Sequence, residues 1–322
     1  MKIVYITSDF FYTVGGIYQH IENLTQFVSR EHEVVIIYLN KNGKEKIYTD
    51  EYKRKIYLLS HKGSKLQRFI SYPLNKINKI VALEKPDIIH VHTLFEAFKI
   101  KILSEKPMVF TNHSSSYLKM YNNFFLRHFV LPQIFKKFTL IICPSTELYQ
   151  KTHHKNVLMI PNGVNRERFN PDNRNKVNRQ KILENLGINY LNQMIILSTR
   201  RLADKNGILD FIEKNINFFQ KAKTSLIYII IGDGEHFEQI KKIKATNNLD
   251  NIYLLGKMEN KEIDAFYYIS DICIIPSKME AISISALEAM ASGCIVISTK
   301  VGGLAELIED DINGKFLKNL LS

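Results

Sequence analysis

Two glutamates, Glu280 and Glu288, are the side chains of this 322-residue chain whose spacing and surroundings first suggest chemistry. Seven residues separate them within the segment 276–299, where an apolar run is followed by a loop and then by small residues. Carboxylates accept hydrogen bonds from hydroxyls, so one glutamate could hold a ribose and the other a second sugar. Alternatively, both are solvated or interact with a helix dipole. We prefer the first interpretation because Glu288 lies among Ser, Ala and Gly, an unusual setting for a solvated carboxylate.

The loop between the two glutamates is predicted to end at a helix whose beginning could bind an anion. Ser283 or Ser285 can cap a helix through 286–292, and Gly293 stands just after its end. The free N–H groups and the positive end of the helix dipole there suit a diphosphate. The segment therefore predicts a diphosphate site flanked by two sugar-binding carboxylates.

Short apolar runs that alternate with amphipathic stretches must position these residues. The first series is KIVYI (2–6), EVVIIYL (33–39), DIIHVH (87–92), MVFTNH (108–113) and LIICPS (140–145). After residue 190 the series resumes with MIILSTR, LIYIIIGDG, IYLLG, ICIIPS and CIVISTK. Apolar strands separated by helices indicate parallel sheets that are covered on both faces.

A polar segment, 161–190, separates the two series and carries two prolines but no predicted strand. The chain is also longer than one hydrophobic core usually serves. The sequence therefore predicts an α/β protein of two Rossmann-like, doubly wound domains, 1–162 and 163–322, facing each other across a cleft. In such sheets ligands bind beyond the carboxyl ends of the strands.

Composition and cysteine usage are those of an ordinary soluble protein, with 45% hydrophobic and 24% charged residues. No apolar run reaches the ~20 residues that cross a bilayer, and the start, MKIVYITSDFF, lacks the features of a signal peptide. Cys143, Cys273 and Cys294 lie far apart in apolar runs, with no metal-site spacing and no disulfide framework. We therefore expect reduced cysteines and a cytoplasmic location.

The net charge of +12 is unevenly distributed. Residues 1–160 contain 23 Lys and Arg against 12 Asp and Glu, whereas residues 161–322 contain 21 against 20. A basic first half favours contact with an anionic partner, such as a membrane surface, a phosphorylated lipid or a nucleic acid. The alternative is that Lys only fills solvated faces.

Five segments, in the order and spacing typical of the family, resemble motifs of the family-four retaining glycosyltransferases with the GT-B fold. The Glu–seven residues–Glu segment that ends in EAMASG is similar to the hallmark of that family. The others are VGGIYQHIENL (14–24), IPNGVNRERFNP (160–171), IGDGEHFEQI (231–240) and VGGLAELIEDDINGKFL (301–317). The resemblance covers residues 2 to about 318. It implies a GT-B fold with an acceptor-binding domain, 1–162, and a nucleotide-sugar donor domain, 163–322.

The resemblance also implies roles for single residues. The first glutamate of the hallmark, Glu280, would contact the donor sugar, and the second, Glu288, the ribose. The segment STRRLADKNG (198–207) is similar to the Arg/Lys pair that holds the donor diphosphate. Such cations offset the charge that builds on the leaving nucleotide. The lysine is Lys205; the arginine stays open, because Arg200 has the spacing of the family and Arg201 its local sequence.

His113, which closes MVFTNH, would meet the donor sugar by the same resemblance. A histidine at a strand end is otherwise more often structural. Glycine lets a backbone approach a phosphate, although Gly-Gly alone is more often a turn. The other implied donor-binding positions are Gly15, Gly16, Gly256, Met258, Ser283, Ile284 and Ser285.

The chain departs from the family pattern in several places. Ser114 stands where the family usually has Gly, and Cys294 where Pro is common. Residues 281–283 are Ala-Ile-Ser instead of Gly-Phe-Gly, so the donor sugar does not carry over. The chain ends with LKNLLS, where relatives continue with helices that cross back onto the first domain. We therefore expect either a short form of the protein or a truncated chain.

Two basic stretches suggest where an acceptor binds. The stretch 53–81 has eight basic residues and no acidic one, and 117–138 mixes Tyr and Phe with Lys and Arg, again without an acidic residue. Basic and aromatic side chains together suit an anionic membrane interface. They also suit single-stranded nucleic acid, but no recognition module supports that. Alternatively, the aromatics are simply core.

The expected function is a retaining, metal-independent hexosyltransferase. It would build a surface polysaccharide or lipopolysaccharide on a glycan or lipid-linked acceptor, peripherally bound to the inner face of the membrane, without nucleic acid. No Asp-x-Asp motif is present, so we expect no metal and no cofactor. The alternatives are a sugar-nucleotide epimerase or a phosphorylase of the same fold, or a non-catalytic donor-binding subunit.

Overall fold

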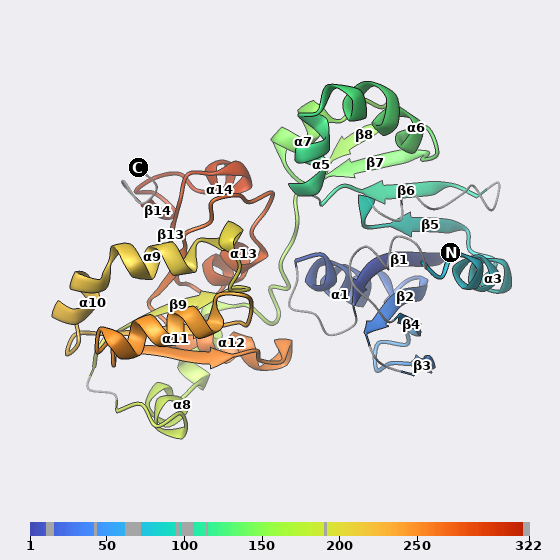
Figure 1. Cartoon of the computed structure of the whole chain (residues 1–322). Helices are drawn as coiled ribbons and strands as arrows, with labels where there is room; N and C mark the ends of the chain where they lie inside the picture. Colours follow the sequence, from blue (N-terminus) through green and yellow to red (C-terminus); the bar gives the residue numbers. More distant parts are fainter. Residues whose placement is uncertain are drawn as a thin grey trace. The chain divides into compact units, whose positions relative to one another are not determined.

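The structure is a computed structural model that describes residues 1–10, 16–41, 44–61, 72–94, 97, 106–113, 115–189 and 192–317. Gly15, Ser114, the end of the chain from 318 and the part of the basic stretch between 62 and 71 lie outside the described residues. The chain divides into two compact units, Met1–Asn162 (unit 1) and Gly163–Ser322 (unit 2), each built on one sheet (Figure 1).

Unit 1 contains an eight-stranded sheet in the order β3-β4-β2-β1-β5-β6-β7-β8. The strands are β1 (Lys2–Phe10), β2 (Glu33–Lys41), β3 (Lys46–Thr49), β4 (Lys55–His61), β5 (Ile88–Val91), β6 (Met108–Thr111), β7 (Leu140–Cys143) and β8 (Val157–Met159). All neighbours are parallel except the edge strand β3, which is antiparallel to β4. The direction in which the chain winds through the sheet changes at β1, which pairs with both β2 and β5.

The central strands of unit 1 form because β-branched residues fill both faces of the sheet. Val35, Ile36 and Ile37 of β2 are at most 1% exposed, and strands buried on both faces are typically continuous apolar runs. The described helices are α1 (Gly16–Val28), α3 (Leu74–Glu84), α5 (Ser115–Tyr121), a π-helical turn η1 (Leu126–Val130), α6 (Leu131–Phe135) and α7 (Thr146–Lys151).

Unit 2 contains a fully parallel six-stranded sheet in the order β11-β10-β9-β12-β13-β14. The strands are β9 (Met194–Thr199), β10 (Leu226–Ile231), β11 (Ile252–Gly256), β12 (Ile272–Ile275), β13 (Ile295–Ser298) and β14 (Lys315–Phe316). This is the Rossmann order, in which the chain starts in the middle and the direction of winding changes between β9 and β12. The carboxyl ends of these two strands are therefore the expected ligand site.

Helices cover both faces of the unit 2 sheet (Figure 1). One apolar cluster joins Ile196, Tyr228 and Ile274 of the sheet to α9 (Ile208–Lys214), α10 (Ile216–Lys221) and α11 (Phe237–Thr246). The other joins Leu197 and Cys273 to α8 (Arg179–Asn185), α12 (Asn260–Ile269), α13 (Ile284–Ala291) and α14 (Gly302–Leu307). Successive strand residues enter opposite clusters, because strand side chains alternate in direction.

The predicted pair of Rossmann-like α/β units with parallel sheets is confirmed. In the described part of the polar segment 161–190 there is no strand, only a 3₁₀ turn (Pro171–Lys176) and α8. The three cysteines are buried and free, as predicted. None of the helices among the described residues is long and apolar enough to cross a membrane.

Candidate functional site

Loops after four strands pack tightly at the carboxyl edge of the unit 2 sheet. A Cβ on Gly232, after β10, would lie 1.9 Å from the carbonyl oxygen of Arg200, after β9. A Cβ on Gly302, after β13, would lie 1.7 Å from the carbonyl oxygen of Glu280, after β12. Gly302 also has a φ of +45°, which glycine adopts more readily than other residues. These two glycines allow the backbones that carry Arg200 and Glu280 to lie against their neighbours.

The guanidinium of Arg200 connects three segments of unit 2. Its Nη1 donates to Ser283 Oγ at 2.9 Å, and its Nη2 donates to Asn206 Oδ1 at 3.2 Å and to the Glu280 carboxylate, with which it forms an ion pair. The side chains of Arg200 and Glu280 are only 10% and 14% exposed. The structure therefore brings together Arg200, Ser283 and Glu280. Arg201 is exposed, and no ion pair joins it to another described residue.

Helix α13 begins where the sequence predicts, with Ser283 as its cap. Ser283 Oγ accepts a hydrogen bond from the backbone N–H of Ala286 at 3.2 Å. Ser285 is not the cap; its hydroxyl donates to the carbonyl of Thr199 at 2.9 Å and so joins α13 to the end of β9. Ile284, the first residue of the helix, is buried. The amino end of α13 thus lies beside the Arg200 guanidinium.

Glu288 is buried one turn inside α13, with only one of its carboxylate oxygens satisfied. Glu288 is only 6% exposed, and Tyr267 Oη donates a hydrogen bond to its Oε2 at 3.0 Å. The Tyr267 hydroxyl also lies 2.5 Å from Thr199 Oγ1. Glu288 Oε1 is buried and has no hydrogen-bond partner. Burial raises the pKa of Glu288 to about 7, although the Tyr267 hydrogen bond opposes this shift.

The remaining predicted donor positions of unit 2 lie at the same edge of the sheet. Lys205 is exposed, and its carbonyl accepts from the backbone N–H of Lys278 at 2.9 Å, which joins the loops after β9 and β12. Gly256 ends β11 with a φ of +69°, and its carbonyl accepts from Gly232 N–H at 2.8 Å. Met258 packs on the apolar cluster that contains α13. Among the described residues, no hydrogen bond joins Met258 to the Arg200–Glu280 pair.

In unit 1, His113 lies at the end of β6 beside two other imidazoles, His20 of α1 and His92 after β5. His92 Nδ1 and His113 Nε2 are 3.2 Å apart, and the ring centroids of His20 and His113 are 4.4 Å apart. Burial lowers the pKa of His20 to about 4 and holds the pKa values of His92 and His113 well below the ordinary value. All three imidazoles are therefore neutral at pH 7. Gly16 is exposed at the start of α1.

Sequence reasoning missed several of these residues. Asn206 and Tyr267 hold Arg200 and Glu288, but they are polar or aromatic residues in unremarkable surroundings, and no spacing singles them out. A signal did exist for His92, because the alternation in DIIHVH places His90 and His92 on one side of a strand.

The chain matches two family descriptions, one in each half. Residues 14–168 match "Glycosyltransferase Family 4", and residues 179–319 match "Glycosyl transferases group 1". The chain is 31% identical to an uncharacterized glycosyltransferase, MJ1178, of Methanocaldococcus jannaschii, over 98% of this chain and 83% of that one. It is 26% identical to an alpha-monoglucosyldiacylglycerol synthase of Acholeplasma laidlawii, over 80% of this chain and 68% of that one.

Solved structures share the fold. Anabaena HepE, solved in complex with UDP and glucose, aligns with a TM-score of 0.74 and 17% identity, over 99% of this chain and 86% of that one. At this identity the likeness concerns the fold alone. The expected GT-B arrangement of two Rossmann-like domains is therefore confirmed.

Replacement of Glu288 by Gln should stabilise the protein at high pH. With a pKa of 4.5 unfolded and about 7 folded, the folded state binds the proton more tightly, so the stability that Glu288 contributes is present below pH 4.5 and is lost as the pH rises through 7. At 1.36 kcal/mol per pKa unit, Glu288→Gln should raise the free energy of unfolding by up to about 3 kcal/mol at pH 8 and by less than about 1 kcal/mol at pH 5.

Urea unfolding followed by circular dichroism measures this difference at the two pH values. The exposed Glu213→Gln is the control for the loss of one negative charge. If Glu288→Gln raised the free energy of unfolding equally at pH 5 and pH 8, the raised pKa of Glu288 would be contradicted.

Proposed function

The chain belongs to the glycosyltransferases of group 1 and family 4, and we propose that it moves a hexose-type sugar from a nucleoside diphosphate donor to a glycan or lipid-linked acceptor. The donor would bind at the carboxyl edge of the unit 2 sheet. The observation that carries this proposal is Glu288 Oε1, a buried acceptor without a partner at the switch point of a Rossmann sheet. A ribose hydroxyl that donates to this oxygen would supply the missing hydrogen bond.

The Arg200–Glu280 ion pair suggests how the donor is held. A diphosphate carries more negative charge than a carboxylate and is a strong acceptor for a guanidinium. Donor binding would therefore draw Arg200 toward the diphosphate, together with the exposed Lys205 and the amino end of α13. Glu280, freed from part of this pairing, would accept hydrogen bonds from hydroxyls of the donor sugar.

The proposed chemistry keeps the configuration of the anomeric carbon. The acceptor hydroxyl forms its bond to the anomeric carbon on the face from which the diphosphate departs, and the departing phosphate oxygen takes the proton of that hydroxyl. Glu280 orients the sugar and forms no covalent bond to it. Arg200 and Lys205 stabilise the charge that develops on the leaving group, so the proposed reaction requires no divalent cation and no cofactor.

Replacement of Arg200, but not of Arg201, should impair donor binding. A hydrogen bond to a charged group contributes about 1.5–3 kcal/mol, so Arg200→Gln should weaken binding of the preferred nucleotide sugar roughly 10- to 100-fold. Arg201→Gln, one residue away and exposed, is the matched control and should bind as the wild type does.

The measurement is isothermal titration with UDP-, GDP- and ADP-sugars, preceded by a thermal-shift screen. A donor at a hundredfold excess over its Kd should stabilise the wild type by about 2.7 kcal/mol. A larger loss in Arg201→Gln than in Arg200→Gln would reverse the assignment of the two arginines. No response to any nucleotide sugar would overturn the donor site.

The alternatives to a transferase are an epimerase or a phosphorylase of the same fold, or a non-catalytic donor-binding subunit. An epimerase converts the donor without an acceptor and a phosphorylase needs inorganic phosphate, whereas a binding subunit turns over nothing. Incubation of the identified donor with and without phosphate therefore separates these activities from transfer. Assignment to surface-polysaccharide or lipopolysaccharide synthesis stays a prediction.

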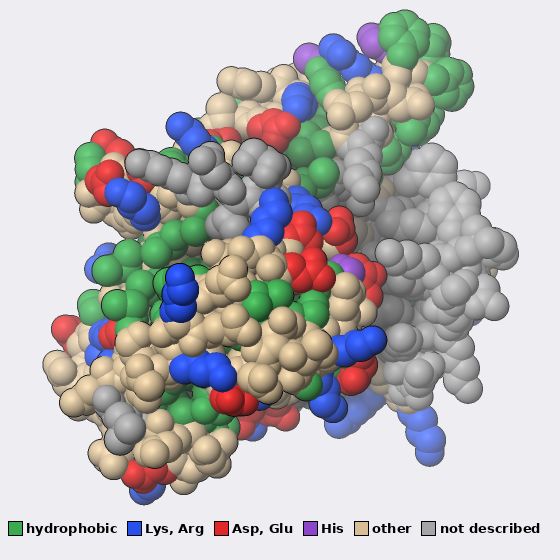
Figure 2. Space-filling view, turned by 60° about the vertical axis from the view of Figure 1, so that its left-hand side comes forward, with side chains coloured by type: hydrophobic (Ala, Val, Ile, Leu, Met, Phe, Trp, Pro, Cys, Tyr) green, Lys and Arg blue, Asp and Glu red, His purple; other side chains and the backbone are tan. Residues whose placement is uncertain are grey.

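An exposed aromatic surface of unit 1 supports the proposal that the acceptor is reached at a membrane. Phe124, Phe125 and Phe129 are 73%, 62% and 58% exposed, whereas Tyr117 and Phe135 of the same stretch are core residues. Hydrophobic side chains gather with His and Lys or Arg over α5 to α6, at the top of Figure 2. The alternative that the aromatics are simply core therefore holds for only part of 117–138.

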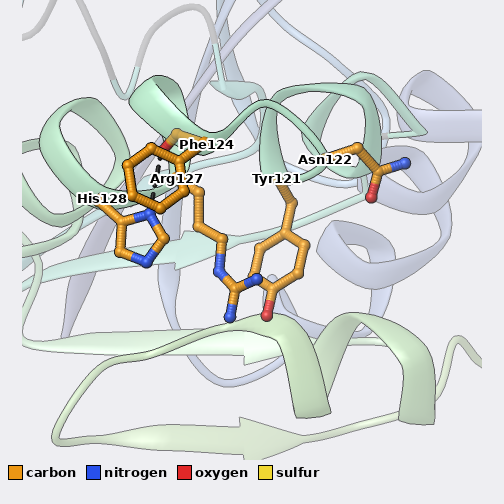
Figure 3. A pocket seen from close by; sticks show the side chains of 5 residues that line it. All are labelled: Tyr121, Asn122, Phe124, Arg127 and His128. Atoms are coloured by element: carbon orange, nitrogen blue, oxygen red, sulfur yellow. Dashed lines mark hydrogen bonds between the residues drawn. The ribbon is translucent and has the colours of Figure 1, made fainter.

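Basic side chains accompany these phenylalanines. Arg127 lies over the Tyr121 ring at 4.3 Å, and His128 lies beside Phe124, with ring centroids 4.3 Å apart (Figure 3). Together with Asn122 these side chains line a shallow pocket. Exposed aromatics beside cations, with no acidic residue from 117 to 138, suit insertion into the interface of an anionic membrane. We therefore propose this surface as the peripheral membrane contact.

The other basic stretch, 53–81, supports this contact less well. In its described part, Arg54 is buried and pairs with Glu22 and Asp50, and Lys55 pairs with Glu84. These cations are engaged by carboxylates from outside the stretch. A lipid-linked acceptor at the inner face of the membrane remains consistent with the similarity to a synthase named for a glycolipid product.

The triple variant Phe124→Ser, Phe125→Ser, Phe129→Ser should lose affinity for anionic vesicles. Burial of one Phe side chain contributes about 1.5–3 kcal/mol, so even partial insertion predicts a loss of at least roughly 10-fold in vesicle binding, measured by co-sedimentation with phosphatidylglycerol. Ile312→Ser, equally exposed at 73% but in unit 2, is the control. Unchanged binding of the triple variant would remove this surface from the proposal.

A further inference from the structure

Three histidines of unit 1 come together from distant parts of the sequence. His20 lies on α1, His92 follows β5 and His113 follows β6, so all three stand at the carboxyl edge of the unit 1 sheet beside its switch point. One ring nitrogen of each lies within 4.8 Å of those of the other two. His92 is fully buried, and the other two are partly exposed. We infer that His20, His92 and His113 form a binding site for one divalent transition-metal ion, namely zinc.

The spacing of the ring nitrogens supports this site. A tetrahedral zinc with Zn–N distances of 2.0–2.1 Å keeps its nitrogen ligands about 3.3 Å apart. His92 Nδ1 and His113 Nε2 are already 3.2 Å apart. A ring nitrogen of His20 lies within 4.8 Å of a ring nitrogen of each of the other two, so a movement of at most roughly 1.5 Å would bring it to the ligand spacing.

The surroundings supply further features of a metal site. Imidazole is the commonest metal-ligating side chain in proteins. The His92 ring packs against Tyr5 and His90, with centroids 5.7 and 4.1 Å away, which fixes its position.

The ligand set identifies the class of ion. Imidazole suits zinc, copper, nickel and iron, whereas magnesium and calcium prefer oxygen ligands. Three nitrogens leave one tetrahedral position open for water or an anionic group, as in open zinc sites. The transfer chemistry proposed for unit 2 does not use this ion. The inference therefore stands or falls independently of the proposed function.

The test is metal binding by the full chain without a histidine tag, after treatment with a chelator. Isothermal titration should show one Zn²⁺ per chain, and Co²⁺ should give the visible absorption of a tetrahedral site. His20→Asn and His113→Gln should each lower the Zn²⁺ affinity by more than the 10- to 100-fold that loss of an outer contact costs. The exposed His153→Asn is the matched control and should bind as the wild type does.

Variants of two metal-binding histidines are measured because one variant could fail to fold, which circular dichroism would reveal. The inference is overturned if the wild type binds no Zn²⁺, or if a folded ligand variant keeps both the stoichiometry and the affinity. Binding of Mg²⁺ as tight as that of Zn²⁺ would also contradict it, since three imidazoles do not favour magnesium.

Discussion

The close approach of loop backbones at the carboxyl edge of the unit 2 sheet is the constraint on which the candidate donor site depends. Gly232 lies against the carbonyl of Arg200, and Gly302 against that of Glu280, at separations that leave no room for a side chain. These contacts fix where the loops after β9 and β12 leave the sheet. Arg200 and Glu280 can therefore meet although they lie 80 positions apart in the sequence. The amino end of α13 lies at the same place because Ser283 both caps that helix and accepts from Arg200.

Charged side chains are buried at the same edge of the sheet, and their burial lowers the stability of the unit. Glu288 is buried with one oxygen unpaired, and its raised pKa reflects the loss of hydration. Arg200 and Glu280 satisfy each other, which lowers the cost of burying both of them. A ligand with hydroxyls and a diphosphate could replace these internal partners by better ones. Buried ionisable groups with strongly shifted pKa values are a common feature of functional sites.

The sequence predicts the sheets well and the contacts between distant residues poorly. Continuous apolar runs such as LIYIII identify β10, because burial on both faces leaves a strong local signal. The edge strand β3 and the short strands β8 and β14 escape prediction, since short or half-exposed strands have no such run. The buried strand β4 also escapes it, although it contains the run IYLL, because that run stands within a stretch noted only for its basic residues. Glu280 and Glu288 could be found from their spacing, whereas Tyr267 could not. Its role arises only when α12 packs against α13, and no local pattern encodes that packing.

The basic charge of unit 1 shows why composition needs the structure for its interpretation. An excess of Lys and Arg first suggests an anionic partner, but Arg54 is buried among Glu22, Asp50 and Thr25 and so stabilises the unit itself. A cation that is already paired attracts a membrane little. Arg127 differs, because it lies on an aromatic ring at an exposed surface with three protruding phenylalanines. Affinity for a membrane surface therefore depends less on the net charge of the unit than on where unpaired charge coincides with exposed apolar area.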